Sequence, residues 1–296
     1  MTKRLLAAVI ATMVLVGGLG LARAGARGEK APQKSAILLV AFGTSVPAAR
    51  KAFDKIEARV KKAFPDAEVR WAFTSKIIRR KLAKEGEKLD SPALALAKLQ
   101  DEGYGKIVVA SFHSLPGEEF HDLHRDVQAF RQMTDAEHRK IVLSRPLLSS
   151  RQNMESVAKA VLAQVPSSRK PADAVVLMGH GSEHHPGDAV YAALAYFCED
   201  IDPNMYIGTV EGQIRLEDIL PKLKAKKTRT VYLMPLMAVA GDHARNDMCG
   251  DDAESWKSIL QKAGFQVKCV LKGTAEIPEV VDVWLGNIKR ASARLK

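Results

Sequence analysis

Aromatic residues and cysteine are both scarce in this 296-residue chain. Phe, Trp and Tyr make up 6% of the sequence, and the three cysteines are Cys198, Cys249 and Cys269. No two of them form a CxxC pair and their number is odd, so we expect buried free thiols and no disulfide framework. No zinc-finger or RNA-binding signature occurs and no aromatics interleave with the basic residues, which argues against a nucleic-acid partner.

Positive charge, in contrast, is abundant. The formal net charge is +11, with 45 Lys and Arg against 34 Asp and Glu. Most of the basic residues are scattered along predicted helix faces, which is typical of solvated surface, although attraction of a polyanionic partner is the alternative. Hydrophobic residues make up 47% of the chain and charged residues 27%, as expected of a soluble globular protein with a full core.

The N-terminus has the pattern of an export signal. Lys3 and Arg4 precede an uncharged apolar stretch at 5–21, and Ala22-Arg23-Ala24 fits a small-x-small cleavage site. We expect a signal peptide over residues 1–28, cleaved near 24–28, and therefore a periplasmic protein with no stable membrane span after cleavage. A retained membrane anchor is the alternative.

From residue 35 onward, short apolar runs alternate with helical patterns. Apolar residues recur on one side of a predicted helix at 48–64, and Ser91-Pro92 is typical of a helix start. Strands are predicted at 36–42, 69–73, 106–112 and 141–143, and again at 174–178, 205–210, 230–234 and 266–271. This alternation predicts an α/β fold of parallel sheets with helices on both faces.

The two halves of the chain also match in detail. Residues 39–45 align with 177–182 across one gap, and residues 108–117 align with 232–241. We interpret this as an internal duplication that gives two Rossmann-like halves, at 35–150 and 151–296, with a cleft between them. Ligands in such folds bind outside the carboxyl ends of the strands.

Three ligand-type residues follow three strands of the second half. His180 comes after the first strand, Glu211 after the second and His243 after the third. If these strands are parallel neighbours, the three side chains converge at one edge of the sheet. Two imidazoles and a carboxylate suit a transition metal such as cobalt, iron, nickel or zinc. A single histidine at a strand end is more often an ordinary loop residue, so the prediction depends on the set of three.

The first half offers hydroxyls and one carboxylate at the corresponding positions. Thr44 and Ser45 stand in place of the histidine loop, Ser75 lies near the counterpart of Glu211, and Glu119 is opposite His243 in the repeat. We therefore predict hydrogen bonds to a substrate from this half and no second metal site.

A further pair of histidines lies on a predicted helix of the first half. His121 and His124 are three residues apart and so share a helix face, where they could bind haem or an accessory metal. Two unrelated surface histidines are the alternative.

Longer motifs carry a resemblance that covers the chain from about residue 35 to its end. They lie at 37–45, 70–75, 113–119 and 178–181 and, most specifically, at 234–248 (MPLMAVAGDHARNDM), with an extension over 252–257. The chain resembles the CbiK-type anaerobic sirohydrochlorin cobaltochelatases, class II chelatases related to ferrochelatase. The resemblance implies a two-lobed chelatase fold around a tetrapyrrole cleft, in which His180, Glu211 and His243 surround the metal.

The same resemblance implies a reaction in which Co²⁺, or alternatively Fe²⁺, enters sirohydrochlorin as two pyrrole protons leave. His180 is then the expected base, with Glu119 as a second base or polar anchor, and Arg245 is a candidate partner for the substrate's carboxylates. We also expect a homo-oligomer.

Export is a departure, because tetrapyrrole synthesis is usually cytoplasmic. An exported haem or metal carrier with a chelatase fold is therefore the alternative function. A periplasmic solute-binding protein is a weaker alternative, because it requires neither convergent histidines nor a duplication.

Overall fold

The computed structural model describes residues 33–133 and 140–295. These residues form one compact unit that contains two four-stranded parallel sheets. The predicted signal peptide lies outside the described residues. Within the described part of the chain, no helix combines the length and the hydrophobicity needed to cross a membrane.

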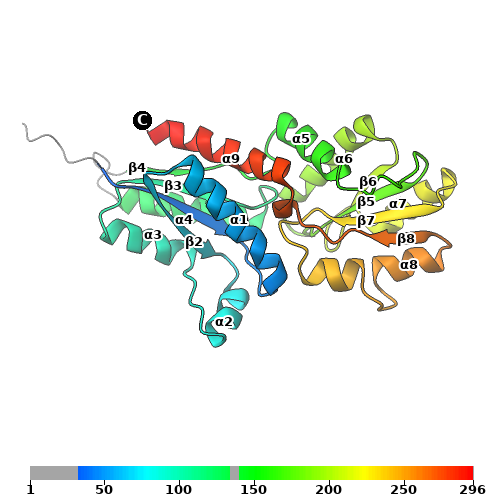
Figure 1. Cartoon of the computed structure of the whole chain (residues 1–296), viewed down its shortest axis with the longest axis horizontal. Helices are drawn as coiled ribbons and strands as arrows, with labels where there is room; N and C mark the ends of the chain where they lie inside the picture. Colours follow the sequence, from blue (N-terminus) through cyan, green and yellow to red (C-terminus); the bar gives the residue numbers. More distant parts are fainter. Residues whose placement is uncertain (1–32, 134–139, 296) are drawn as a thin grey trace, which may run out of the picture. The chain divides into compact units, whose positions relative to one another are not determined.

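The first sheet has the strand order β2-β1-β3-β4, and all its pairs are parallel (Figure 1). Strand β1, one of its two central strands, is buried along almost its whole length, as its unbroken apolar sequence predicts. The elements in this part of the chain are β1 (Ser35–Ala41), α1 (Pro47–Ala63), β2 (Ala67–Phe73), α2 (Lys76–Lys84), α3 (Pro92–Asp101), β3 (Lys106–Ser111), α4 (Glu118–Met133), β4 (Lys140–Leu143) and α5 (Arg151–Leu162).

The second sheet repeats this topology with the order β6-β5-β7-β8. Its edge strand β8 is largely exposed, whereas β5 and β7 are fully buried. Its elements are β5 (Ala174–Gly179), η1 (Pro186–Asp188), α6 (Ala189–Ile201), β6 (Met205–Thr209), α7 (Leu216–Ala225), β7 (Thr230–Pro235), η2 (Ala244–Met248), α8 (Trp256–Lys262), β8 (Gln266–Cys269), η3 (Thr274–Glu276), α9 (Pro278–Ser292) and η4 (Ala293–Leu295).

The predicted fold class is confirmed, because the two sheets are parallel, share one strand order and alternate with helices in the chain. The eight predicted strands all occur, with ends that differ from the prediction by at most two residues. The predicted helix start at Ser91-Pro92 is also present, since the Ser91 hydroxyl accepts a hydrogen bond from the Leu94 N–H at the start of α3. The division into halves at residue 150 stays a prediction.

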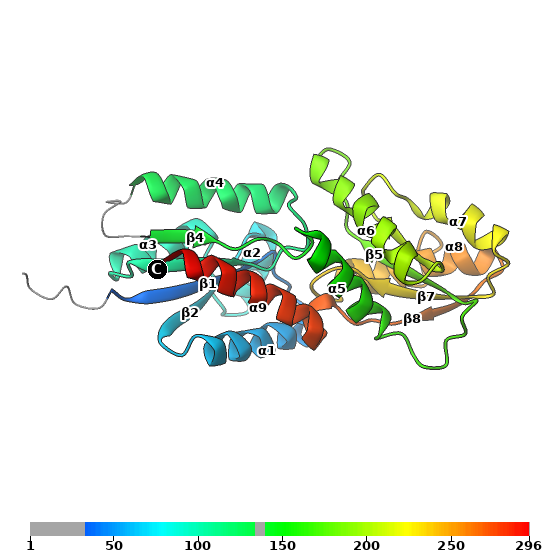
Figure 2. The same ribbon diagram turned by 90° about the horizontal axis from the view of Figure 1, so that it is seen from above.

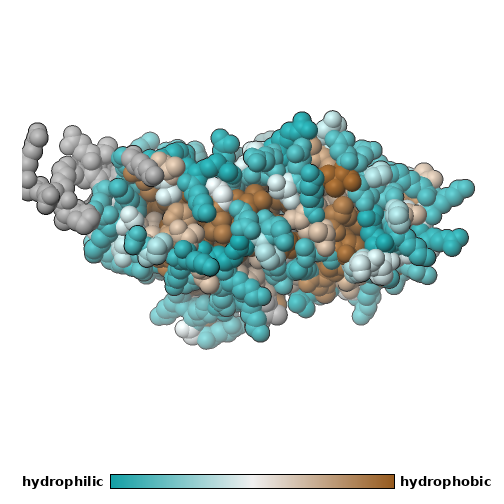
Figure 3. All heavy atoms as spheres, turned by 45° about the horizontal axis from the view of Figure 1, so that its top comes forward, coloured by the Kyte–Doolittle hydropathy of each residue, from teal (hydrophilic) through white to brown (hydrophobic). Residues whose placement is uncertain are grey.

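The last helix of the chain packs against the first sheet. Helix α9 lies against β3, β4 and α5 (Figures 1 and 2). The rings of Trp284 on α9 and Phe112 after β3 have centroids 5.3 Å apart. Trp284 is fully buried. The hydrophobic core therefore includes side chains from both sheets and from α9. Hydrophilic side chains cover most of the face shown in Figure 3, with smaller hydrophobic areas between them.

The cysteines differ from the sequence-based expectation. Cys249 and Cys269 form a disulfide with Cα atoms 6.2 Å apart, and only Cys198 is a buried free thiol. The expectation of free thiols was wrong for two of the three because residues 20 positions apart are brought together by sheet pairing. Strand β8 ends at Cys269, beside β7 and close to the end of η2, where Cys249 lies.

Candidate active site

The strand order of the second sheet brings the three predicted ligand residues to one edge. Strand β5 lies between β6 and β7, and the pairing of β5 with β6 continues past their ends. The Val210 N–H donates to the Gly179 carbonyl (3.1 Å), and the Glu211 N–H donates to the His180 carbonyl (2.8 Å). The backbones of His180 and Glu211 are thus hydrogen-bonded to each other at the carboxyl ends of their strands.

The side chains of this set also lie together. The imidazole rings of His180 and His243 have centroids 4.7 Å apart and are nearly perpendicular. The His180 Nδ1 atom lies 4.0 Å from a carboxylate oxygen of Glu211. The side chains are 48% exposed for His180, 60% for Glu211 and 35% for His243, so all three are open to a ligand.

Local hydrogen bonds engage Nδ1 of both His180 and His243 and leave Nε2 of each ring as the nitrogen that can react. His180 Nδ1 is 2.9 Å from the Gly181 carbonyl, which only accepts, so Nδ1 carries the proton. His243 Nδ1 is 2.5 Å from an Asp247 carboxylate oxygen and donates to it. In both neutral rings Nε2 therefore keeps its lone pair, which can accept a proton or bind a metal ion.

Asp247 was missed by the sequence reasoning. It lies four residues after His243, and the carboxylate and imidazole meet because the intervening residues form the π-helix η2. Histidines that bind metals usually donate their other ring N–H to such a carboxylate, which fixes the ring orientation and raises the basicity of the free nitrogen. The available signal was the four-residue spacing, which allows contact only if the segment is helical.

No closed metal site is assembled from these side chains. Within residues 33–133 and 140–295, no three His, Cys, Asp or Glu side chains are arranged so that they could hold an ion. The three side chains are neighbours at one sheet edge with their ligating atoms still apart.

Loops from the first sheet face this edge. A Cβ atom on Gly241, two residues before His243, would lie 4.0 Å from the Thr44 hydroxyl, and one on Gly187 would lie 2.4 Å from the Pro116 carbonyl. Glu119 lies in the first turn of α4, and among the described residues no hydrogen bond or ion pair joins it to His180, Glu211 or His243. Its role stays a prediction.

The predicted hydroxyl groups have local partners. Thr44 is buried and its hydroxyl accepts from the Val46 N–H (3.1 Å), while Ser45 next to it is half-buried. The Ser75 hydroxyl caps α2 by accepting from the Ile78 N–H (3.3 Å). Arg245 is exposed, and its Nε donates to the Ala240 carbonyl (3.2 Å). Among the described residues, no hydrogen bond or ion pair is formed by its two Nη atoms.

The histidine pair on α4 has two separate partners. His121 Nδ1 lies 2.9 Å from His185 Nε2, in the loop that also carries His180. His124 Nε2 lies 3.1 Å from the Gln128 side-chain amide. The two histidines share a helix, as predicted, and among the described residues it is His121 whose ring contacts the loop of the second sheet.

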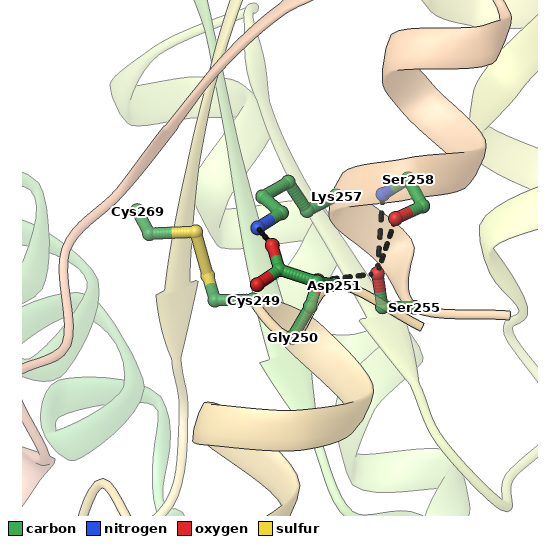
Figure 4. The surroundings of a disulfide bond; sticks show 7 residues. All are labelled: Cys249, Gly250, Asp251, Ser255, Lys257, Ser258 and Cys269. Carbon is green, nitrogen blue, oxygen red and sulfur yellow. Dashed lines mark hydrogen bonds and ion pairs between the residues drawn. A yellow bond between two sulfur atoms is a disulfide. The ribbon is translucent and has the colours of Figure 1, made fainter. Parts of the chain in front are cut away.

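The disulfide lies at the far end of the segment that follows His243. Figure 4 shows Cys249 joined to Cys269, beside a turn in which Asp251 pairs with Lys257 (2.5 Å). This lysine holds the pKa of the Asp251 carboxyl below its usual range by hydrogen bonding to it. In the same turn the Ser255 hydroxyl donates to the Gly250 carbonyl (2.8 Å) and accepts from the Ser258 N–H. The covalent link therefore closes a segment that is already ordered by local hydrogen bonds.

A family model described as cobalt chelatase (CbiK) matches residues 35–293. The sirohydrochlorin cobaltochelatase CbiKC of Nitratidesulfovibrio vulgaris strain Hildenborough is 43% identical over 262 residues, which cover 88% of this chain and 92% of that protein. The sirohydrochlorin cobaltochelatase of Salmonella typhimurium strain LT2 is 35% identical over 260 residues, which cover 87% of this chain and 96% of that protein.

Two solved structures resemble this one at low sequence identity. SirB from Bacillus subtilis with Fe³⁺ has a TM-score of 0.64 at 15% identity, over 88% of this chain and 97% of its own. CbiX, described as the terminal enzyme of sirohaem biosynthesis in denitrifying bacteria, has a TM-score of 0.55 at 16% identity, over 88% of this chain and 99% of its own. At such identities the likeness concerns the fold alone.

Proposed function

The chain belongs to the cobalt chelatase (CbiK) family, and from that premise we propose that it inserts Co²⁺ into sirohydrochlorin with release of two pyrrole protons. The observation that carries the proposal is the meeting of His180, Glu211 and His243 at the carboxyl edge of the second sheet. Two full-length relatives that are named sirohydrochlorin cobaltochelatases support this choice of substrate and metal.

The proposed mechanism divides binding and proton transfer between the two imidazoles. His180 accepts a pyrrole proton at Nε2, because its Nδ1–H is already donated to Gly181. His243, oriented by Asp247, and Glu211 hold the incoming metal above the ring. An imidazole that has accepted a proton can release it to solvent, so His180 can take up the two pyrrole protons one after the other.

Polar groups from the first sheet complete the proposed substrate site. Thr44, Ser45 and Ser75 follow β1 and β2 and offer hydroxyls, and Glu119 offers a second base or polar anchor. Arg245 is exposed next to the His243 segment and is the proposed partner of a substrate carboxylate.

Turnover tests this function directly. The mature protein is incubated anaerobically with excess sirohydrochlorin and Co²⁺, and ring absorbance is followed beside a His180→Ala/His243→Ala variant. We expect many turnovers for the wild type and the uncatalysed rate for the variant. His184→Ala is a matched control, because this exposed histidine lies in the same loop and should not alter the rate.

The same assay separates the chelatase from the carrier and tests a second metal. We propose that Fe²⁺ also enters the ring, because imidazole and carboxylate ligands suit both ions. Binding of one equivalent without turnover, with Co²⁺ and with Fe²⁺, would refute the chelatase and favour an exported haem or metal carrier.

Export is proposed as part of this function. The signal-like N-terminus supports it, as does the Cys249–Cys269 disulfide, since such bonds persist mainly in oxidising compartments. N-terminal sequencing of protein from a periplasmic fraction should find a mature chain that begins near residues 24–28. An uncleaved chain in the membrane or the cytoplasm would contradict the proposal.

We also propose a homo-oligomer in which haem or an accessory metal binds at His121 and His124. Both side chains are exposed on α4, and His124 Nε2 accepts from the Gln128 amide, so it has a lone pair that could instead bind iron. Haem and metal content and light-scattering mass are measured for the wild type and for His121→Ala/His124→Ala. Equal ligand content in both proteins would contradict the ligand role, and a monomeric wild type would contradict the assembly.

A further inference from the structure

A buried carboxylate lies behind the loops that carry His180 and Glu211. Asp188 is the last residue of η1, precedes α6 and is only 3% exposed. One of its carboxylate oxygens accepts from the Ser182 N–H (3.0 Å), and the other accepts from the Gln213 N–H (2.8 Å). Each donor comes from a different loop of the candidate site.

These two backbone donors lie two residues beyond the proposed metal ligands. Ser182 follows His180 in the loop after β5, and Gln213 follows Glu211 in the loop after β6. The direct backbone hydrogen bond between His180 and Glu211 joins the loops on one side, and Asp188 joins them on the other. The loops that carry His180 and Glu211 are thus held together twice, by the backbone hydrogen bond between these two residues and by the carboxylate of Asp188.

Glycine packing shows how closely the loops approach each other at this point. Gly181 has a φ of +83°, and a Cβ there would lie 2.4 Å from the Gly212 nitrogen. A Cβ on Gly212 would lie 2.5 Å from an Asp188 carboxylate oxygen. The two loops therefore contact each other through backbone, with the carboxylate seated directly against Gly212.

Helix α6 supports the same loop from behind. The ring of Tyr191, three residues after Asp188, occupies the space where a side chain at Gly179 would lie, and Tyr191 is buried. Asp188 and Tyr191 thus connect the start of α6 to the residues on both sides of His180.

We propose that Asp188 is a positioning residue that sets the separation of His180 and Glu211 and so the fit of the site to the incoming metal; this inference rests on the proposed chelatase function. A carboxylate suits this place because both of its oxygens accept. In Asp188→Asn one oxygen becomes an NH₂ group, which would face a backbone N–H without an acceptor between them. One loop is then released while the side-chain volume is unchanged.

A matched control exists in the same sheet. Asp173 is also buried (7% exposed) and also accepts a backbone N–H, from Lys170 at 2.9 Å, but it lies before β5 at the opposite edge of the sheet. Asp173→Asn therefore removes a buried carboxylate of the same kind without touching the candidate site.

The experiment compares Co²⁺ binding and turnover in the wild type, Asp188→Asn and Asp173→Asn. Binding of Co²⁺ alone is measured by calorimetry, and kcat and KM are measured with sirohydrochlorin. We expect Asp188→Asn to weaken Co²⁺ binding and lower kcat by about 10-fold or more, the size of effect seen for groups that orient metal ligands. The KM for sirohydrochlorin should stay within about twofold, because those contacts are not altered.

Two results would overturn the proposal. One is Co²⁺ binding and kcat in Asp188→Asn that equal those of the wild type. The other is an equal loss in Asp188→Asn and Asp173→Asn that follows their melting temperatures, which would assign Asp188 a role in stability alone. If the wild type binds Co²⁺ but does not metallate the ring, the proposed function fails, and the binding comparison still decides the role of Asp188.

A measurement that needs no variant covers the case in which Asp188→Asn does not fold. Amide hydrogen exchange of the wild type should show slow exchange at Ser182 and Gln213, although both lie in loops, and fast exchange at the exposed Glu183, which follows Ser182. Fast exchange at both Ser182 and Gln213 would show that the carboxylate does not hold the loops.

Discussion

The imidazole of His113 titrates far from its usual range because it is buried. It follows β3, is 9% exposed, and burial lowers its pKa from 6.5 to about 4. Its Nδ1 lies 2.9 Å from the Ser111 hydroxyl, and its Nε2 has no hydrogen-bond partner among the described residues. In the folded protein this ring is therefore neutral at pH 7.

A dependence of stability on pH follows from this shift. Below pH 6.5 the unfolded chain takes up a proton at His113, but the folded protein does so only near pH 4. The free energy of unfolding should thus be highest above pH 6.5 and fall toward pH 4, by up to about 1.4 kcal/mol per pH unit. Urea denaturation at pH 7 and pH 5 measures it.

The variant His113→Gln isolates this contribution. The drop in unfolding free energy between pH 7 and pH 5 should be larger in the wild type than in the variant by about 2 kcal/mol. Equal drops would show that other groups cause the whole pH dependence and that His113 is not held neutral.

Asp247 should matter through the orientation of His243. In Asp247→Ala the Nδ1–H of His243 loses its charged acceptor, so the ring can rotate and its Nε2 becomes less basic. We expect chelatase kcat to fall about 10- to 100-fold with little change in the KM for sirohydrochlorin. Steady-state kinetics at several pH values measures this change.

Asp247→Asn is the informative comparison for this position. Its amide oxygen can still accept from Nδ1, so it should restore part of the activity lost in Asp247→Ala, with an altered pH profile because the charge is absent. Activity of Asp247→Ala within about twofold of the wild type would show that His243 needs no orienting partner.

Two of the three main side chains of the candidate site could be predicted from sequence because they follow predicted strands directly. His180 and Glu211 each lie within two residues of a strand end, where a parallel sheet leaves little choice of position. Asp188 and Asp247 could not be found this way. Their contacts depend on the path of an irregular loop and on a π-helix, and neither has a periodicity that appears in the sequence.

At the scale of elements, the disulfide is the feature that sequence reasoning missed. Strand periodicity predicted β8, but the closeness of Cys249 to Cys269 depends on how the segment after η2 returns beside the sheet edge. Spacing alone cannot define which cysteines meet in a folded chain.

The disulfide should stabilise the second sheet through the unfolded state. It joins residues 20 positions apart, and the loss of chain entropy for a loop of this length corresponds to about 3 kcal/mol. We expect Cys249→Ala/Cys269→Ala to lower the free energy of unfolding by about this amount. Denaturation in urea under oxidising conditions gives the value.

Reduction of the wild type provides the control. A thiol reductant should lower the stability of the wild type toward that of the double variant and leave the double variant unchanged. If the reductant has no effect on the wild type although mass spectrometry shows reduced thiols, the bond contributes nothing to stability.

At the scale of the whole molecule, the C-terminal helix α9 is hydrogen-bonded to the segment that follows the first sheet. Asn287 on α9 is 3% exposed, and its Nδ2 donates to the carbonyls of Arg145 (3.1 Å) and Pro146 (3.0 Å), which follow β4. Its Oδ1 accepts from the Asn153 side chain on α5 (3.2 Å). The side-chain amide of Asn287 thus links α9 to the segment after β4 and to α5, which both lie more than a hundred residues earlier in the chain.

Helix α9 belongs to the second repeat of the sequence but packs on the first sheet, so tertiary contacts join the two repeats. The internal repeat predicted two parallel sheets, and α9 follows β8 as α5 follows β4. It did not predict that α9 would lie against β3, β4 and α5. The packing of α9 on the first sheet is determined by tertiary contacts, which bury Trp284 and Asn287, and not by a local sequence pattern.

Asn287→Ala should therefore destabilise the molecule as a whole. Two carbonyls at the start of the β4–α5 connection lose their donor inside the protein, and a buried group left without its partner costs about 1–3 kcal/mol. Lys289→Ala is the matched control, because it lies two residues away on the exposed side of the same helix and should change stability by less than about 0.5 kcal/mol. Urea denaturation followed by far-UV circular dichroism measures both.

Because the described residues form one compact unit, we expect a single transition in each variant, shifted only for Asn287→Ala. A second, separate transition in Asn287→Ala would instead show that the two sheets unfold independently once this contact is lost.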